Sequence, residues 1–226
     1  MKMNKLALAC GIAMLGLSSV AAAEISTNIG VTSNYVWRGL TQSGNGTSFS
    51  GGIDYSHGSG LYAGTWMAQA WDDYELDLYG GYAGEVADFG YDAGLIYYTY
   101  SKDTDSNFSE IYVNGSWKFL SAGFAYALTA EDAVEAVEED LYFYVGASYD
   151  LPEDFSAGLT IGFVNTDGDG DADGEDYTHY QVDLTKSTES FGDVTFSLSD
   201  TDLDGSSDVG GEDADMRFFV SWAKEF

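Results

Sequence analysis

The feature that most constrains this chain is an alternation of apolar and polar residues that recurs in one segment after another. In residues 155–163, for example, phenylalanine, alanine, leucine and isoleucine occupy every second position, and serine, glycine and threonine lie between them. Successive side chains of a β-strand point to opposite faces, so this period predicts strands with one apolar and one polar face. The segments with this pattern are 25–38, 47–57, 61–70, 74–85, 90–101, 108–118, 119–130, 140–150, 155–163, 176–187, 192–201 and 214–226.

The lengths of these segments and of their connections indicate how the strands are arranged. About ten residues are enough for a tilted strand to cross a bilayer. Every second connection is short, whereas most of the others are longer and acidic, as in outer-membrane barrels with short periplasmic turns and longer external loops. A sheet in lipid must also close, because an open edge leaves backbone groups without partners. We therefore predict an all-β fold, an antiparallel up-and-down transmembrane β-barrel of about twelve strands.

The beginning of the chain has the pattern of a secretory signal peptide. Two lysines precede the apolar run 6–20, and three alanines follow it directly before Glu24. The run is shorter than a membrane-spanning helix, although a short membrane anchor is the alternative reading. We expect a signal peptide at 1–23 and an outer-membrane β-barrel at 24–226, exported and assembled in a Gram-negative bacterium. The single cysteine lies inside the apolar run, which excludes a disulfide scaffold for the remainder.

The charge of the chain excludes one class of partner. The sequence has 38 acidic and 8 basic side chains, for a formal net charge of −30. A nucleic-acid-binding protein needs a basic surface to meet the phosphates, so we expect no nucleic-acid partner.

Aromatic residues near the strand ends support a membrane location. Such rings suit the two interfaces between lipid and water. We expect the following residues to face lipid there: Tyr35, Trp37, Tyr55, Tyr74, Tyr97, Trp117, Tyr149 and Trp222. The terminal residue, Phe226, closes an alternating strand and resembles the signal that the barrel assembly machinery reads. The expected partners are therefore this machinery, outer-membrane lipid and lipopolysaccharide. A secreted β-sandwich would also alternate, but it does not explain the even strand number, the loop asymmetry and this phenylalanine together.

One motif resembles a known family. Residues 31–43, Val-Thr-Ser-Asn-Tyr-Val-Trp-Arg-Gly-Leu-Thr-Gln-Ser, are similar to the N-terminal motif of the proteobacterial Gcw_chp or TorF-like porin family. The rest of the chain from residue 24 onwards agrees with this family in strand plan and length. The resemblance implies an outer-membrane barrel that acts as a porin. It names no solute and supplies no catalytic residues.

The polar face of the strands is expected to line the barrel interior. The charged residues predicted there are Arg38, Asp54, Glu75, Asp77, Asp92, Glu110, Lys118, Asp183 and Arg217. Carboxylates in a channel wall favour cations, so we expect a channel for passive passage of small hydrophilic solutes with a cation preference. The alternative is a structural or adhesive barrel whose interior is filled by paired charges and tyrosines. Arg38 is the best single candidate for a functional cation, and a structural salt bridge is its other role.

Two acidic segments indicate weak calcium binding in the external loops. Both have the pattern D-x-D-x-D-G, formed by Asp169, Asp171, Asp173 and by Asp200, Asp202, Asp204. Three carboxylates at this spacing can converge on Ca²⁺. Neither segment has the glutamate that completes an EF-hand, so a merely solvated acidic surface is the alternative. We expect no other cofactor.

Enzymatic activity is the rival class of function. Some outer-membrane barrels modify lipids with a serine that a histidine activates. The chain has two histidines, His57 in an expected periplasmic turn and His179 near the outer rim. Spacing assigns no serine to His179, and no G-x-S-x-G motif is present. We therefore expect that the protein is not an enzyme.

Overall fold

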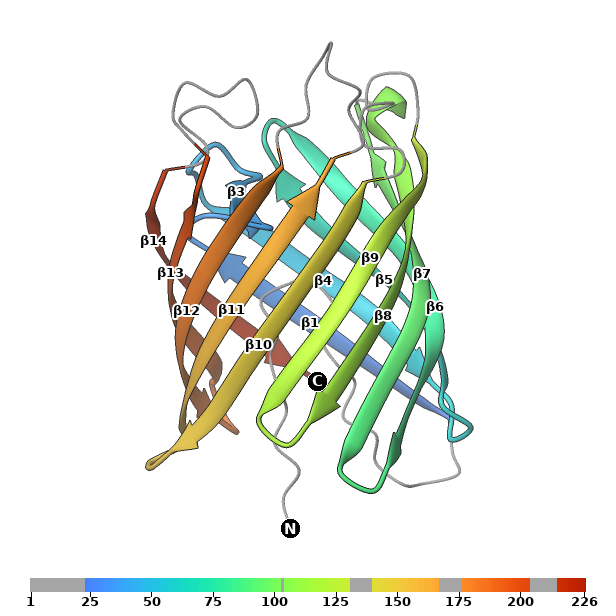
Figure 1. Cartoon of the computed structure of the whole chain (residues 1–226), viewed down its shortest axis with the longest axis vertical. Coiled ribbons are helices and arrows are strands. Elements are labelled where there is room, and N and C mark those ends of the chain that lie inside the picture. Colours follow the sequence, from blue (N-terminus) through green and yellow to red (C-terminus); the bar gives the residue numbers. More distant parts are fainter. Residues whose placement is uncertain (1–22, 103, 131–139, 167–175, 204–214) are drawn as a thin grey trace.

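The protein is a closed antiparallel β-barrel of twelve strands, which confirms the predicted fold class (Figure 1). The computed structural model describes residues 23–102, 104–130, 140–166, 176–203 and 215–226. The barrel strands are β1 (Glu24–Thr32), β4 (Ser48–Ser56), β5 (Leu61–Ala70), β6 (Asp73–Val86), β7 (Phe89–Tyr100), β8 (Phe108–Trp117), β9 (Leu120–Ala130), β10 (Leu141–Leu151), β11 (Phe155–Asn165), β12 (Tyr177–Thr188), β13 (Gly192–Thr201) and β14 (Arg217–Glu225).

Two short strands and one 3-10 turn complete the described structure. The strands β2 (Val36–Trp37) and β3 (Leu40–Thr41) pair only with each other, and η1 (Thr104–Ser106) is one 3-10 turn. Within the described ranges, no helix is long and apolar enough to cross a membrane.

The first and last strands close the barrel. Thr32 of β1 lies opposite Ser48 of β4 on one side and opposite Ser221 of β14 on the other. Beyond β14, Phe226 and Thr27 exchange backbone hydrogen bonds of 2.8 and 3.2 Å. The sheet therefore has no free edge at this seam, as a lipid environment requires.

The two faces of the wall differ in chemistry, as the alternation predicts. In β12, Val182 and Leu184 are exposed on the outside, whereas His179 and Gln181 are buried inside. The same arrangement recurs around the barrel, with large apolar side chains outside and mainly polar and tyrosine side chains within. This is the reverse of a globular protein in water, and it suits a wall between lipid and an aqueous lumen.

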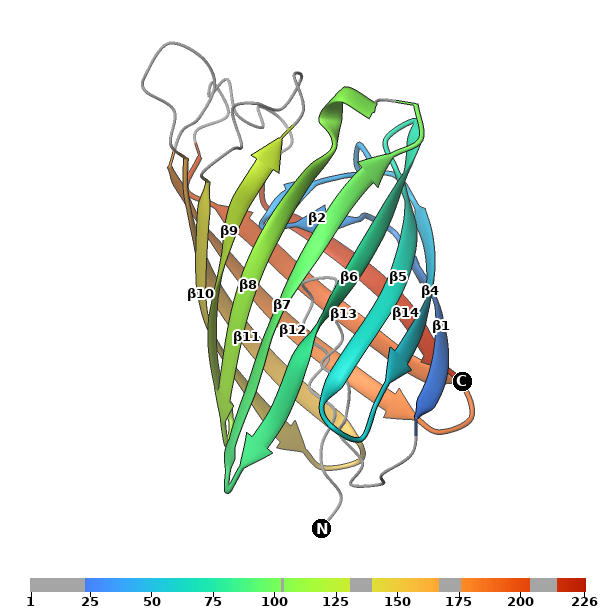
Figure 2. The ribbon, with the colours of Figure 1, turned by 90° about the vertical axis from the view of Figure 1, so that its right-hand side faces the viewer.

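The connections lie at two distinct ends. Short turns follow β4, β6, β8, β10 and β12 at one end of the barrel (Figure 2). The chain enters β1 at this same end, because Glu24 lies opposite Ser56 beside the first short turn. Most connections at the other end are longer, with the turn between β5 and β6 as an exception. We call these ends the turn end and the loop end.

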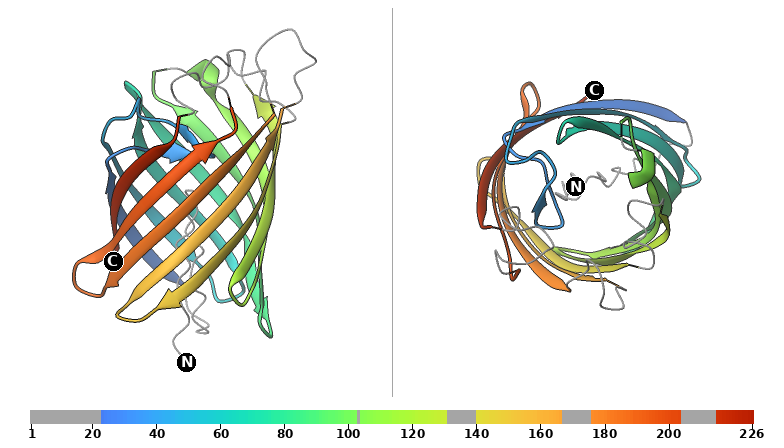
Figure 3. Two further views of the ribbon diagram at one scale, coloured as in Figure 1. Left: turned by 60° about the vertical axis from the view of Figure 1, so that its left-hand side comes forward. Right: turned by 90° about the horizontal axis from the view of Figure 1, so that it is seen from above.

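The first strand is shorter than the alternation indicates. It ends at Thr32, and residues 33–47, which we call the strap, fold inside the wall (Figure 3, right). Thr32 Oγ1 donates a hydrogen bond of 2.7 Å to the Asn34 carbonyl, which turns the chain at this point. Tyr35 and Trp37 therefore lie in the lumen, and their expected place facing lipid is wrong. The other aromatic residues expected to face lipid do lie on the outer face: Tyr55, Tyr74, Tyr97, Trp117, Tyr149 and Trp222.

Candidate functional site

The interior of the barrel carries most of the charged residues that the sequence places there. The strands supply them from different sides of the wall: Asp54 from β4, Glu75 and Asp77 from β6, Asp92 from β7, Glu110 from β8, Asp183 from β12 and Arg217 from β14. All are buried except Asp183, which is half-buried. Arg38 comes from the strap instead of a wall strand.

Arg38 fixes the strap to the far wall. Its two terminal nitrogens donate hydrogen bonds of 2.8 Å to the two carboxylate oxygens of Glu110. The guanidinium also lies 4.1 Å from the ring centroid of Trp37 and 4.3 Å from that of Tyr142. Burial lowers the pKa of Arg38, but the charge and hydrogen bonds of Glu110 together with the nearby Tyr98 and Tyr142 outweigh burial, and the pKa ends above its ordinary value. The strap therefore keeps its positive charge and its ion pair.

Other strap residues reach different strands. The Tyr35 hydroxyl donates a 2.7 Å hydrogen bond to Glu75 on β6. At Gly39, where φ is +87°, a Cβ atom would lie 2.6 Å from side-chain carbons of both His179 and Thr201. Only glycine fits this approach to β12 and β13. The strap thus starts at β1 and contacts the wall on several sides, which narrows the lumen near the loop end.

Near the start and end of the strap, asparagines complete its attachment. Asn34 accepts a 2.5 Å hydrogen bond from Thr41 and donates one of 3.1 Å to Asn45. The same oxygen of Asn45 accepts a 2.5 Å hydrogen bond from Nε of Arg217 on β14. The predicted wall cation Arg217 therefore holds the strap against the last strand.

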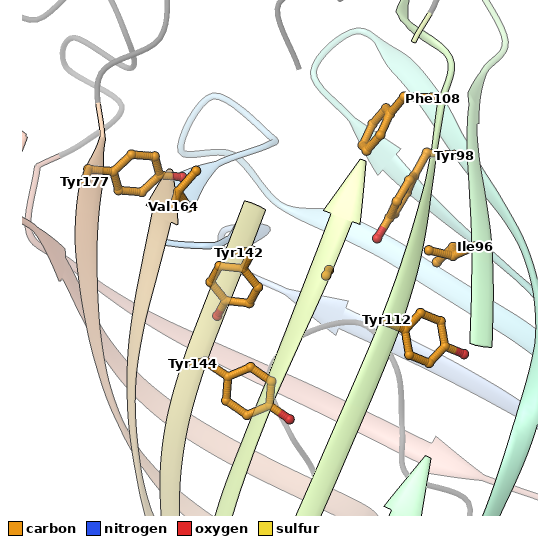
Figure 4. Packing of buried hydrophobic residues seen from close by; sticks show 9 residues of the cluster. Ile96, Tyr98, Phe108, Tyr112, Tyr142, Tyr144, Val164 and Tyr177 are labelled. Carbon is orange, nitrogen blue, oxygen red and sulfur yellow. The ribbon is translucent and has the colours of Figure 1, made fainter. Parts of the chain in front are cut away.

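Aromatic rings cover the inner wall from β7 to β12 (Figure 4). Tyr98 and Phe108 stack with ring centroids 4.4 Å apart, and the Tyr98 hydroxyl donates a 3.2 Å hydrogen bond to Glu110. Tyr142 stacks on His179 with centroids 5.7 Å apart. These rings give the acidic interior a largely aromatic surface.

A second network lies nearer the turn end. The Tyr62 hydroxyl lies 2.5 Å from Asp92 and 2.5 Å from the Tyr112 hydroxyl. Asn114 donates to the other oxygen of Asp92 at 3.4 Å and accepts from Tyr144 at 3.0 Å. Both oxygens of Asp92 therefore have partners within the wall.

Asp54 and Asp183 are also satisfied by neighbours. Asp54 accepts hydrogen bonds from the Tyr79 hydroxyl and from Asn28, the latter at 3.3 Å. Asp183 accepts from Ser197 at 2.6 Å and from Gln181 at 3.1 Å.

One predicted wall residue lies elsewhere. Lys118 is exposed in the turn between β8 and β9, with its ammonium 4.6 Å from the Trp117 ring on the outer face. Its expected place along the lumen is therefore wrong. The reason is that β8 ends one residue earlier than the alternation indicates, and the turn carries Lys118 at a φ of 56°.

The two histidines occupy unrelated places. His57 Nδ1 lies 2.8 Å from Ser59 Oγ and 3.2 Å from the Ser59 amide, which is a local contact within the exposed turn between β4 and β5. His179 is buried in the lumen, and its Nε2 lies 2.9 Å from the Tyr142 hydroxyl. Neither arrangement resembles a serine and a base held by a third group.

Most of the predicted calcium ligands lie outside the described residues, namely Asp169, Asp171, Asp173 and Asp204. Asp200 is the next-to-last residue of β13, and Asp202 accepts a 2.7 Å hydrogen bond from the Thr178 amide. In the part of the chain that the structure describes, no three acidic, histidine or cysteine side chains gather as metal ligands. Calcium binding by these loops stays a prediction.

Comparisons with solved structures support the fold. A structure described as KdgM porin matches over 91% of this chain and 98% of its own, with a TM-score of 0.58 and 9% identity. The same porin in complex with disordered oligogalacturonate matches equally well, at 0.58 and 9%. The NanC porin matches over 88% and 98%, with a TM-score of 0.51 and 14% identity. At such identities the likeness shows the fold alone.

Sequence comparison gives a more specific result. No curated protein sequence matches the chain. The model of one family, described as "Bacterial protein of unknown function (Gcw_chp)", matches residues 18–222. This range includes the strap and all but the end of the last strand. The chain therefore belongs to the Gcw_chp family.

Proposed function

We propose that the protein is a porin-like channel of the bacterial outer membrane for passive passage of small hydrophilic solutes, with a preference for cations. The closed wall with an apolar outside and a polar inside supports this function. The likeness in fold to structures described as porins agrees with it.

The observation that carries the cation preference is the charge imbalance of the inner face. Carboxylates line the wall from β4 to β8, and a further one lies on β12. The two inward arginines are both engaged, Arg38 by Glu110 and Arg217 by Asn45. Fixed negative charges in a low-dielectric passage concentrate cations and repel anions.

The charge imbalance of the inner wall also bears on which solutes fit the lumen. The KdgM porin is described in complex with oligogalacturonate, which is a polyanion. A wall with excess carboxylates repels such a chain, so the solute of KdgM does not transfer to this protein. Small cations and neutral polar solutes fit the interior better.

The strap supports a second candidate, a structural or adhesive barrel with no throughput. Its contacts with β6, β8, β12 and β14 occupy part of the lumen near the loop end. Conductance separates the two functions.

The test is single-channel recording with the refolded chain 24–226 in a planar bilayer under a KCl gradient. Folding is verified first by the shift in gel mobility on heating. We expect discrete current steps and a reversal potential of the sign that K⁺ selectivity gives. Silence from a properly folded barrel would reject the channel and favour the structural function. Steps that close on adding Ca²⁺ would support calcium binding by the D-x-D-x-D-G loops, and unaltered steps would weaken it.

The remaining expectations concern export and assembly. We propose that residues 1–23 direct export, that Phe226 is read by the barrel assembly machinery, and that lipid and lipopolysaccharide surround the barrel. Phe226 has its side chain exposed, and its backbone pairs with Thr27 at the seam. Removing Phe226 is expected to lower the amount of heat-modifiable barrel in outer-membrane fractions. We expect no lipase or acyltransferase activity in the wild type.

A further inference from the structure

Asp77 differs from the other acids of the wall. It is 4% exposed on β6, and its Oδ1 is buried with no hydrogen-bond partner in the described structure. The carboxylates nearest to it in the wall are satisfied. Glu75 accepts from the Tyr35 and Tyr100 hydroxyls, and Glu110 accepts from Arg38 and Tyr98.

An unpaired carboxylate in such a place is costly. Moving an ionised carboxylate out of water without a compensating partner has a desolvation cost on the order of several kcal/mol. Without a positive partner such a carboxyl group takes up a proton, so it is ionised here only together with a cation from outside the chain.

Aromatic rings flank this carboxylate on both sides. The cross-strand neighbours of Asp77 are Trp66 on β5 and Tyr98 on β7, and both face the lumen. The strap adds one ring to each of them. Tyr35 packs against Trp66 with centroids 5.7 Å apart, and Trp37 packs against Tyr98 with centroids 6.1 Å apart. Asp77 thus lies between two pairs of rings.

This combination selects the kind of cation. A hard metal ion needs several oxygen ligands, and no group of three candidate metal ligands exists among the described side chains. Ring faces instead attract organic cations, and a carboxylate beside aromatic rings suits an alkylated ammonium group. We propose that Asp77, Trp66, Tyr98 and the strap rings Tyr35 and Trp37 form a binding site for a small organic ammonium cation. The inference rests on the proposed function, because the cation reaches Asp77 through the lumen.

The strap completes this site. Two of the flanking rings belong to residues 33–47, and the Arg38–Glu110 ion pair holds this segment in place. Binding at Asp77 and the position of the strap are therefore coupled.

The experiment measures choline binding to the refolded chain 24–226 in detergent by titration calorimetry, which does not depend on conductance. Asp77→Asn removes the charge at nearly constant shape, and Trp66→Leu removes a ring but keeps the charge. Asp183→Asn is the matched control, because it removes a lumen carboxylate on β12 whose partners are within the wall. We expect Asp77→Asn to weaken choline binding at least about tenfold and Trp66→Leu about threefold, with Asp183→Asn unchanged.

Each result has a definite meaning. Equal choline affinity in the wild type and in Asp77→Asn would overturn the proposal, and so would a conducting wild-type channel that does not bind choline. Choline binding that is sensitive to Asp77 in a barrel without conductance would support the site and reject the channel. If Asp77→Asn does not fold, Trp66→Leu decides: unaltered affinity there would overturn the aromatic site.

Discussion

Arg38 and Glu110 form a bidentate ion pair across the lumen, with two nitrogen–oxygen distances of 2.8 Å and a sequence separation of 72. Both side chains are buried, at 8% and 3% exposure. A pair in this environment is stable only while both partners are present, because either charge alone is left without compensation. The position of the strap therefore depends on this single contact more than on any surface ion pair.

Replacing Arg38 by methionine is expected to release the strap. Glu110 is then buried without its counter-charge, which is expected to lower the free energy of unfolding by about 3–5 kcal/mol. The single-channel conductance is expected to rise, because the strap no longer occupies its place in the lumen. The double variant Arg38→Met, Glu110→Leu is the control and is expected to regain stability while conductance stays high. Unchanged conductance in the single variant would contradict a strap that narrows the lumen.

Gly39→Ala is expected to displace the strap without changing any charge. A Cβ at this position meets His179 and Thr201 at 2.6 Å, and the positive φ disfavours it further. We expect the free energy of unfolding to fall by about 1–3 kcal/mol. We also expect the single-channel conductance to rise. Gly158→Ala is the matched control, because its Cβ would meet Asp183 at an ordinary 3.5 Å. Denaturant titration and bilayer recording check both variants, and equal effects would refute the close approach at Gly39.

The orientation of the wall is tested by neighbouring residues of β12. Val182 is 52% exposed on the outer face, and Gln181 is buried on the inner face. Val182→Arg is expected to destabilise the barrel in lipid, lowering the free energy of unfolding by about 2–4 kcal/mol, as for a charge near the bilayer midplane. Gln181→Arg places the same charge beside Asp183 and is expected to lower the free energy of unfolding much less. Refolding into lipid vesicles measures both, and the reverse order would show that the faces are misassigned.

Cation selectivity is expected to depend on the wall carboxylates. Neutralising Asp54 and Asp92 together by asparagine is expected to move the reversal potential in a KCl gradient toward zero. The shift is expected to shrink at 1 M salt, where the Debye length falls to about 3 Å. Asp88→Asn is the control, because Asp88 lies exposed in the turn between β6 and β7. A double variant as selective as the wild type would remove the basis of the proposed cation preference.

The sequence predicts the barrel well because lipid and water impose the same period on every strand. The expected segments 61–70 and 192–201 agree with β5 and β13 to the residue. The same rule explains the main error. Tyr35 and Trp37 continue the spacing of β1, and alternation does not tell a ring that faces lipid from one that faces the lumen.

The candidate site was only partly predictable for a related reason. Alternation places Asp77 and Glu110 on the inner face, which the structure agrees with. Whether a carboxylate finds a partner there depends on contacts between distant segments, such as Tyr35 with Glu75. The signal available in the sequence was the group of glycines at 39, 44 and 46, directly after an expected strand that ends at Arg38, because glycines disfavour a regular strand.

The place of Gly39 has a consequence for the order of assembly. Its neighbours His179 and Thr201 belong to strands near the end of the chain, whereas the strap leaves the first strand. The strap reaches its final place only after these late strands have joined the sheet. We therefore expect a newly inserted barrel to pass through a stage in which the strap is not yet docked, with the contact at Gly39 among the last of the fold to form.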